Sequence, residues 1–579
     1  MTDDQGYGDI AAHGNPVIRT PNLDRLYRES VRLTEFHASP TCAPTRAALL
    51  TGRHEFHSGV THTIDERERL ARSATTLPDL LRRAGYTTGI FGKWHLGDED
   101  AYQPGRRGFD RSFIHGAGGI GQTYPGSCGD VEGNRYVDPV IRSDGEFVAT
   151  TGYCTDVFFD EALAWMRRCR KNETPFFCMI TSNAPHAPLD CPAGSDGVYL
   201  DLLEKAGVGD PKQRAQIAKF YGMIENIDTN VGRLLAELER LGMAGDTLVV
   251  FTTDNGTANG SSVFNAGMRG AKGTVWRGGT RVPSFWRWKG SLPEGVDVPA
   301  VTAHLDVLPT LCEIAGVEVP PEVAAKIEGR SLVPLLRDAT AEWPDRPLVT
   351  HQGRWKRGQA AASQFANVRV REGRWSLVNV ANSPDGWELY DVAADPGEVR
   401  DVADGNPDMV RRLAEFYDRW WAGVQAELVN ENLDGPAENP FKVAYRRQQE
   451  STPAKKPAVR KSAGKKRKGA GKEETPAESF PPPTFAEFLA ARSRLLPEIA
   501  RYSPYALVSA DDPPVYLVYA SPPDLGKPAK DPTHSANLGA KLKERLDAVG
   551  VDCELAYPGS KPRYIAVKDY LCDVLAPRD

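Results

Sequence analysis

The stretch from Ser39 to Val60, "SPTCAPTRAALLTGRHEFHSGV", sets a single cysteine in surroundings that would activate a thiol. Pro44 suits the first turn of a helix, where its missing N–H is no loss, and good helix formers follow it. Cys42 is therefore expected at a helix N-terminus, where free backbone N–H groups and the helix dipole favour an anion. Arg46 lies one turn further on and adds a fixed positive charge. These neighbours favour a chemically active cysteine over a buried structural one.

Polar residues that could join this cysteine follow three predicted strands. The strands cover residues 86–91, 175–180 and 247–253, and each is a short apolar run. Open α/β sheets bind ligands at the carboxyl ends of their strands, so the loops after these runs should converge. Those loops carry Lys93 and His95, then His186, then Asp254 and Asn255.

Helices and strands are predicted to alternate along the first 340 or so residues, and they position these side chains. One helix is predicted after Thr76, with Pro78 in its first turn and Gly85 after its end. Apolar residues from Ile217 to Leu238 recur at helical spacing and predict an amphipathic helix. Helices that alternate with strands predict an α/β domain.

Composition excludes several classes of protein. The chain has 71 basic and 77 acidic residues, a net charge of −6, so no chain-wide field favours nucleic acid or a membrane surface. Its apolar runs are strand-sized, far shorter than the roughly 20 residues of a membrane span. The nine cysteines form no CxxC pair, so neither a disulfide framework nor a structural zinc site is indicated. We expect a soluble protein without nucleic-acid or membrane partners.

The cysteine motif "CAPTR" resembles the C-x-P-S-R element of type I sulfatases, in the alkaline phosphatase superfamily. That cysteine is oxidised after translation to formylglycine (3-oxoalanine). The resemblance covers roughly residues 1–430 and implies an arylsulfatase-like sulfuric ester hydrolase. Its implied fold is an α/β/α sandwich with a smaller C-terminal antiparallel sheet plus a helix. The supporting motifs, in the family's order, are "TDDQGYGD", "TPNLDRL", "CAPTRAALLTGR", "GKWHLG", "PHAP", "TDNG", "GAKGTVWRGGTRVP", "LDVLPTL" and "ELYDVAADPGE".

The resemblance also implies catalytic roles. One hydroxyl of the hydrated aldehyde would attack sulfur, and the other would let the aldehyde re-form and expel sulfate. Lys93 and Lys272 match the family's sulfate-binding lysines, and Arg46 would hold the hydrate. His95 matches the residue that hydrogen-bonds the hydrate, and His186 matches the general acid for the leaving oxygen. The chain has 11 histidines, and we expect the others, His54 among them, to be ordinary surface residues.

A metal site follows from the same resemblance. Its implied ligands are Asp3, Asp4, Asp254 and Asn255, with the modified Cys42 completing the shell. Oxygen ligands that include an amide carbonyl favour Ca²⁺, with Mg²⁺ as the second choice. The cation would lower the pKa of the hydrate and bind a sulfate oxygen.

Three positions depart from the family pattern. Thr45 replaces the commoner serine, and we expect modification of the cysteine to survive. Trp276 and Arg277 stand where Tyr and Glu are more frequent, so substrate preference near this turn is expected to differ. Family members carry a central strand before the paired aspartates, whereas only two residues precede Asp3. The alternatives are a start further upstream, with a signal peptide and a periplasmic or secreted location, or an impaired chain that is cytoplasmic.

Four segments are expected along the chain. Residues 1–345 form the catalytic domain, with its first strand truncated, and residues 346–430 form the smaller subdomain. Residues 431–482 are a basic linker rich in Lys, Pro and Ala, which is a solvated tether or contacts an anionic polymer. Residues 483–579 resemble the C-terminal half of an α/β-hydrolase domain. They have no G-x-S-x-G element and are expected to be non-catalytic.

The predicted activity is hydrolysis of sulfate esters, either aryl sulfates or sulfated carbohydrates. Its partners would be a sulfated small molecule or polysaccharide and, during maturation, a formylglycine-generating enzyme. Two alternatives stay open: a phosphonate or phosphodiester hydrolase that uses the same site, and an impaired protein that binds sulfated polysaccharide. The stretch 116–140 either lines the cleft or forms a surface loop, and its tyrosines could stack on a substrate ring.

Overall fold

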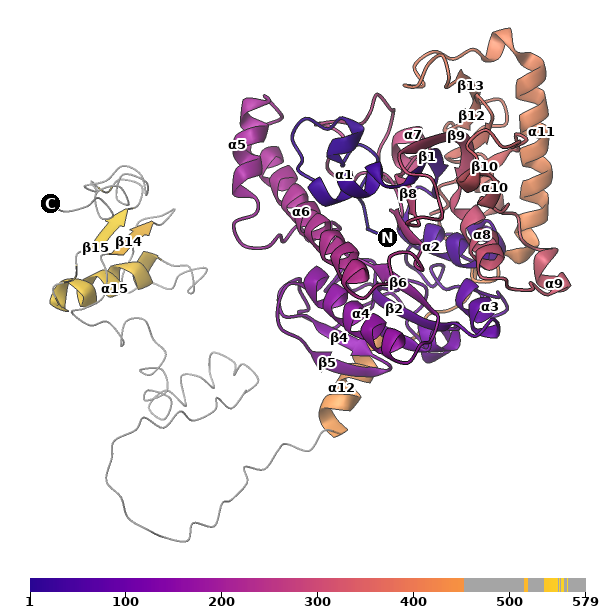
Figure 1. Cartoon of the computed structure of the whole chain (residues 1–579). Coiled ribbons are helices and arrows are strands. Elements are labelled where there is room, and N and C mark those ends of the chain that lie inside the picture. The colour runs from indigo at the N-terminus through magenta and orange to yellow at the C-terminus, as the bar shows by residue number, and fades with distance from the viewer. Residues whose placement is uncertain (452–514, 519–535, 550, 552, 557–559, 561–579) are drawn as a thin grey trace. The chain divides into compact units, whose positions relative to one another are not determined.

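The computed structural model describes residues 1–451, 515–518, 536–549, 551, 553–556 and 560 (Figure 1). The chain divides into two compact units, residues 1–457 and 458–579. The helices are α1 (Pro21–Arg28), α2 (Cys42–Thr51), α3 (Leu77–Arg83), α4 (Cys154–Lys171), α5 (Gly197–Lys205), α6 (Pro211–Arg240), α7 (Arg277–Thr280), α8 (Val307–Ile314), α9 (Pro321–Ala324), α10 (Val333–Arg337), α11 (Pro407–Val424), α12 (Pro440–Ser451) and α15 (Ala536–Val549). The strands are β1 (Val31–His37), β2 (Thr87–Lys93), β3 (Arg111–His115), β4 (Val140–Ser143), β5 (Glu146–Ala149), β6 (Phe176–Thr181), β7 (Val249–Thr252), β8 (Ser284–Arg287), β9 (Val296–Ala303), β10 (Leu348–His351), β11 (Val368–Glu372), β12 (Trp375–Asn379), β13 (Trp387–Asp391), β14 (Val515–Val518) and β15 (Cys553–Ala556).

Two sheets form the middle layer of the first unit, in the orders β5-β4-β3-β2-β6 and β7-β8-β1-β9. Successive side chains of a strand point to opposite faces, and the core follows this alternation. Phe91 of β2 joins the apolar cluster under α1, α4 and α6, whereas its neighbour Ile90 joins the cluster under α2, α8 and α10. Helices therefore cover both faces, and the predicted α/β/α arrangement is confirmed.

Two predicted elements have different bounds in the structure. The strand predicted at 86–91 extends to Lys93, because β2 pairs in parallel with β3 up to the pair Lys93 and His115. Lys93 therefore ends a strand rather than lying in a loop. The helix predicted from Ile217 begins at Pro211, since the Asp210 side chain accepts the backbone N–H of Gln213 and caps the first turn.

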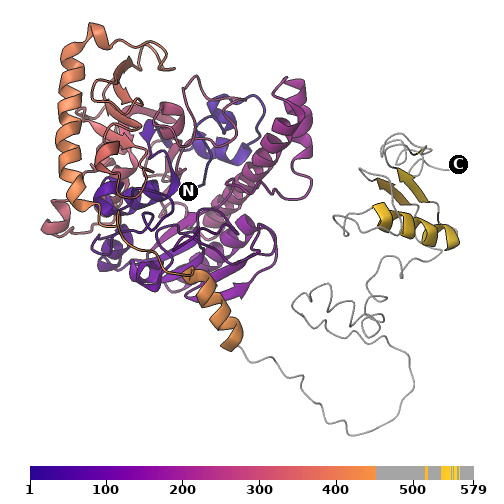
Figure 2. The same ribbon diagram turned by 180° about the vertical axis from the view of Figure 1, so that it is seen from behind.

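The smaller subdomain is an antiparallel sheet with one helix on it. Strands β10 to β13 are neighbours in chain order, and α11 contacts β11 and β12. Its core includes Val370 and Leu377 of the sheet and Trp421 of α11, all buried. Figure 2 shows α11, in orange, at the periphery of the first unit beside this sheet. The predicted antiparallel sheet plus helix is confirmed.

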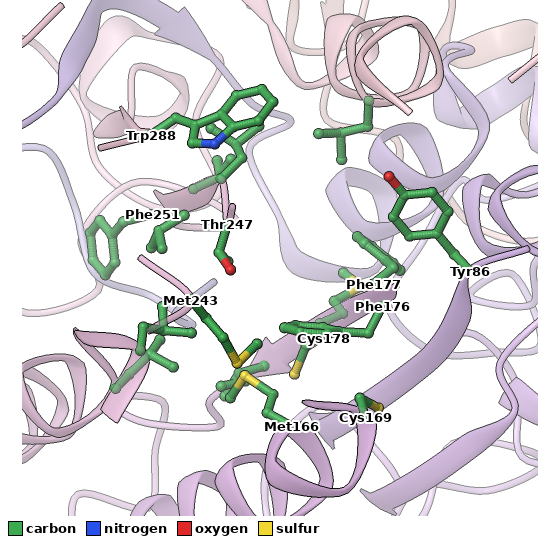
Figure 3. A pocket seen from close by; sticks show the side chains of 18 of the residues that line it. Tyr86, Met166, Cys169, Phe176, Phe177, Cys178, Met243, Thr247, Phe251 and Trp288 are labelled. Carbon is green, nitrogen blue, oxygen red and sulfur yellow. The ribbon is translucent and has the colours of Figure 1, made fainter. Parts of the chain in front are cut away.

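The two core sheets meet at the first residues of the chain. The Met1 amino group donates to the carbonyl O of Ile180, at 2.8 Å. Thr2 forms a parallel bridge with Thr253, so these residues lie between β6 and β7. A largely apolar cavity of about 690 Å³ continues from them between the same two strands. Figure 3 shows its walls, with Phe176, Phe177 and Cys178 on one side and Met243, Phe251 and Trp288 on another.

The first part of the segment predicted as a linker contains a helix. Residues 440–451 form α12, and the Phe441 ring is buried edge-on against Phe147 of β5. Burial of this aromatic side chain holds the segment on the first unit. The basic composition of the residues that follow gave no indication of this contact. Residues 452–482 lie outside the described residues.

The second unit is described only in part. Strands β14 and β15 pair in parallel, and α15 lies between them in the chain. None of the helices in the described part of the chain has the length and apolar character needed to cross a membrane.

Candidate active site

The site is built around the start of α2. Cys42 is its first residue and is buried, and Pro44 lies in the first turn as predicted. The Thr45 hydroxyl accepts the backbone N–H of Ser39 at 2.9 Å. A serine at this position carries the same hydroxyl, so the departure at Thr45 keeps the bond that ties the preceding loop to the helix.

A buried guanidinium links three elements of the site. Arg46 is 1% exposed, and its Nη2 lies 2.7 Å from Oδ2 of Asp254, after β7. Its Nη1 donates to the carbonyl O of Lys93 at 2.9 Å, at the end of β2. This charge therefore fixes α2 against the ends of β2 and β7.

Both predicted sulfate-binding lysines form ion pairs with the aspartates at the chain start. Lys93 Nζ lies 2.5 Å from Oδ2 of Asp3, and both side chains are fully buried. Lys272 Nζ lies 2.5 Å from Oδ1 of Asp4. The pairs join residues 90 and 268 positions apart in the chain. Each lysine is thus held in place by a carboxylate.

The predicted general acid, His186, lies near Asp4, the partner of Lys272. Its Nε2 lies 3.8 Å from Oδ2 of Asp4, and its Nδ1 donates to the carbonyl O of Ala187 at 2.7 Å. The hydroxyl of Tyr136 donates to the carbonyl O of His186 at 2.7 Å. Burial, with help from Lys272, lowers the pKa of His186 to about 4. Nε2 is therefore unprotonated at neutral pH before substrate binds.

His95 follows β2 and is the second histidine of the site. Its Nε2 donates to the carbonyl O of Thr63 at 2.8 Å, which leaves Nδ1 as an acceptor. This Nδ1 is buried and has no hydrogen-bond partner among the described residues. Burial and the nearby Lys93 lower the pKa of His95. The residue has a positive φ of 58°, a strained backbone of the kind found at functional sites.

The charges of the site also act on the thiol. Burial alone would raise the pKa of Cys42, but Lys93 and Lys272 outweigh it, and the net shift is downward. Conversely, burial and the neighbouring Asp254 raise the pKa of Asp3. A carboxylate that resists ionisation beside a second carboxylate is a common property of a cation site without its ion.

The predicted metal ligands lie together. One donor atom each from Asp3, Cys42 and Asp254 lie within 4.8 Å of one another, and Asp3, Asp4 and His186 form a second such group. Oδ1 of Asp3 and Oδ1 of Asn255 are buried without a hydrogen-bond partner in the described part of the chain. Unpaired buried oxygens are costly, and a hard cation would satisfy them. The residues therefore fit Ca²⁺ or Mg²⁺.

The stretch 116–140, for which the sequence left open a cleft-lining segment or a surface loop, contributes to the site. The first part of the stretch 116–140 lies against both histidines, because a Cβ on Gly119 would fall 2.7 Å from Nδ1 of His186, and one on Gly118 would fall 3.1 Å from Cε1 of His95. Its clustered glycines were the available signal. The prediction for His54 was wrong: it is buried, because its ring packs edge-on against Phe56 and Trp420.

Asp9 holds the turn that follows the paired aspartates. Its Oδ2 accepts the backbone N–H of Gly6 at 2.8 Å, and burial raises the pKa of Asp9 to about 7. Because the folded pKa exceeds the unfolded one, near 3.8, the wild type loses stability as pH rises from about 4 to about 7. Asp9→Asn removes this loss. Its free energy of unfolding should exceed the wild type's at pH 8 by on the order of 2 kcal/mol, with little difference at pH 4.

Urea unfolding at both pH values measures this difference. The exposed Asp385→Asn serves as a control and should follow the wild type at both pH values. A gain from Asp9→Asn that is equal at pH 4 and pH 8 would contradict the titration and point to packing instead.

A family model described as Sulfatase matches residues 1–317, more than half of the chain. The chain belongs to the sulfatase family. A second model, described as N-sulphoglucosamine sulphohydrolase, C-terminal, matches residues 271–417 of this sulfatase.

Individual relatives agree with this membership. N-acetylgalactosamine-6-sulfatase of Sus scrofa is 32% identical over 376 residues, which cover 61% of this chain and 67% of that protein. Steryl-sulfatase of Mus musculus is 31% identical over 521 residues, 74% and 81% of the two chains. The solved structure of Ps i-CgsB with k-i-k-neocarrahexaose has a TM-score of 0.64 at 23% identity, covering 78% of this chain and 97% of that one, and shares the fold. The sulfatase is a sulfuric ester hydrolase, and the predicted family, fold class and enzyme class are confirmed.

Proposed function

We propose that this sulfatase hydrolyses aryl or carbohydrate sulfate esters with a formylglycine derived from Cys42. The observation that carries the proposal is the position of this residue. It starts a helix, is buried, and lies near enough to Lys93 and Lys272 for both to lower the pKa of its thiol. An anion-stabilising environment of this kind suits a nucleophile that attacks an anionic sulfate ester. Conversion of the thiol requires a formylglycine-generating enzyme as a partner during maturation.

The proposed metal ligands are Asp3, Asp4, Asp254 and Asn255, with the modified Cys42 as the fifth. Bound Ca²⁺, or Mg²⁺ as the second choice, would supply Lewis-acid stabilisation of the hydrate and of a sulfate oxygen. Supporting this assignment, Oδ1 of Asp3 and Oδ1 of Asn255 have no partner among the described residues. The proposed ligand atoms are mostly oxygens, and Ca²⁺ and Mg²⁺ prefer oxygen ligands.

Charge balance explains how the site attracts its substrate. Three buried or nearly buried cations, Arg46, Lys93 and Lys272, face three carboxylates through the ion pairs described above. With a divalent cation bound and all three carboxylates ionised, these charges would cancel and the cation would leave an excess of about two positive charges for the sulfate ester. Both lysine ammonium groups would bind sulfate oxygens as point charges and exchange part of their contact with the aspartates.

Two histidines divide the proton transfers. His95 has an acceptor at Nδ1, because Nε2 donates to Thr63, and would accept a hydrogen bond from the nucleophilic hydroxyl. His186 would protonate the leaving oxygen from Nε2, since its Nδ1 proton is bound to Ala187. A sulfate ester beside Nε2 raises the pKa of His186 toward neutrality, because negative charge favours the imidazolium. The second unit is proposed to take no part in this chemistry.

Turnover of matched substrates tests the function. Protein produced in a host with formylglycine-generating enzyme should hydrolyse 4-nitrophenyl sulfate with a kcat/KM at least about 100-fold above that for bis(4-nitrophenyl) phosphate. The reverse preference would favour the phosphodiester or phosphonate hydrolase. No turnover of either substrate by fully modified protein would favour a protein that only binds sulfated polysaccharide.

Metal binding should stabilise the folded chain. After chelation with EDTA, addition of Ca²⁺ at about 100 times its dissociation constant should raise the free energy of unfolding by about 2.7 kcal/mol, seen as a Tm increase of several degrees. Asn255→Ala should lose most of this shift, because it removes an unpaired buried oxygen. The exposed Asp385→Asn should keep it. An unchanged Tm with both Ca²⁺ and Mg²⁺ would contradict the metal site.

A further inference from the structure

The turn after β10 contacts two segments of the active site. Gln352 Nε2 donates to the carbonyl O of Gly273 at 2.5 Å, and Gly273 follows the proposed sulfate-binding lysine. Two residues later, Arg354 Nη2 donates to the hydroxyl of Thr63 at 3.0 Å. The carbonyl O of the same Thr63 holds His95. The turn thus connects the smaller subdomain to the segment that carries Lys272 and to the residue that holds His95.

The backbone of this turn is tightly held. Gly353 and Arg354 have φ of 64° and 61°, and the second is a conformation that non-glycine residues rarely adopt. A Cβ on Gly353 would fall 2.1 Å from the carbonyl O of Thr61, and this oxygen accepts the N–H of Arg354 at 3.0 Å. The next residue, Trp355, is buried and donates from Nε1 to Oε1 of Glu431 at 2.5 Å. Such strain persists only where the surroundings fix the chain.

Arg354 differs from other arginines around the site. It is exposed and forms no ion pair with any described residue. Among the described residues, its side chain has one hydrogen-bond partner, the neutral hydroxyl of Thr63. Other arginines of this region are buried and matched by carboxylates, in the pairs Arg46 with Asp254, Arg67 with Glu431 and Arg69 with Glu99. Arg354 is therefore a positioned guanidinium whose remaining N–H groups are available to a ligand.

The charge of Arg354 acts on two further polar groups, His62 and Tyr124. Nδ1 of His62 accepts the backbone N–H groups of Thr63 and Ile64, at 2.8 and 3.1 Å, so Nε2 is the donor of this ring. Tyr124 is half-buried, and burial raises the pKa of its phenol, which both Cys42 and Arg354 influence.

We propose that the substrate carries a second anionic group besides the sulfate ester, and that Arg354 binds it next to His62 and Tyr124. The inference rests on the proposed function, because it places the sulfate ester at Cys42. A planar guanidinium pairs with a carboxylate or a sulfate through two parallel hydrogen bonds. The substrate class is then a polyanionic sulfated molecule, with the second charge on a carboxylate or on another sulfate.

Calorimetric titration of the full-length protein with sulfonates tests this directly, since sulfonates mimic sulfate esters but cannot be hydrolysed. The monoanionic ligands are benzenesulfonate and naphthalene-2-sulfonate. Each is compared with dianions on the same ring system, which carry a second sulfonate or a carboxylate at different distances from the first sulfonate. At least one dianion should bind about tenfold more tightly than the matched monoanion. The better of the two dianion types identifies the second group as a sulfate or a carboxylate.

Arg354→Gln should remove this advantage, whereas Arg357→Gln should keep it. Arg357 is exposed on the same segment and pairs with Asp434, so the control removes the same charge. The advantage should also shrink with added salt, because exposed charges are screened. Dianions that bind no more tightly than monoanions, or an advantage that survives in Arg354→Gln, would overturn this inference but leave the proposed function standing. A protein that binds neither class would contradict the sulfate site, and with it the proposed function.

Discussion

Replacement of Cys42 by alanine is expected to reduce kcat/KM for 4-nitrophenyl sulfate by at least about 1,000-fold. Alanine cannot be converted to an aldehyde, so the proposed nucleophile is lost while the small apolar volume of the buried side chain is largely kept. The measurement is steady-state turnover of the purified variant beside the wild type, with circular dichroism to compare their folds.

Cys169→Ala is the matched control for this experiment. Cys169 is buried near the end of α4, far from the predicted motif in sequence, and it should retain wild-type turnover. If Cys42→Ala kept more than about a tenth of the activity, a covalent role for this residue would be wrong. The same loss in both variants would instead indicate a general sensitivity to cysteine removal.

Asp254→Asn is expected to lower both the turnover and the stability of the protein. Turnover should fall by about 1,000-fold, because a proposed metal ligand loses its charge. Stability should fall by about 1 to 3 kcal/mol, because the buried Arg46 keeps only a neutral acceptor where it had an ionised one. Urea unfolding without added metal measures the second effect separately from the first.

The exposed Asp385→Asn controls for the loss of a carboxylate, and it should change neither quantity. Added Ca²⁺ gives a further discrimination, because it should stabilise the wild type more than Asp254→Asn. An Asp254→Asn variant with full activity and full stability would show that this carboxylate neither binds metal nor balances Arg46.

The part of the site that sequence could predict was local. Pro44 and the helix formers after it predicted the start of α2, and the structure confirms Cys42 as its first residue. Strand patterns likewise predicted the neighbourhood of His186. These signals depend on residues within about one helical turn, where propensity and capping act. The roles of the same residues came from the resemblance of short motifs.

The parts that sequence could not predict depend on contacts between distant segments. Arg354 lies in a region without a motif, and its place beside Thr63 joins residues 291 positions apart. The hydroxyl of Tyr136 supports His186 across 50 positions. Phe441 anchors α12 although charged and proline-rich residues follow it. Periodicity reports which face of an element is buried, but it does not report which distant element covers that face.

The most direct test of the formylglycine mechanism is the mass of the peptide that contains Cys42, in protein produced with a formylglycine-generating enzyme. We expect a peptide about 18 Da lighter than the cysteine form, because sulfur and two hydrogens leave and one oxygen enters. Treatment with an aldehyde-reactive hydrazide should then shift this peptide and no other. An unmodified thiol, in a preparation where a control sulfatase is converted, would contradict the formylglycine mechanism.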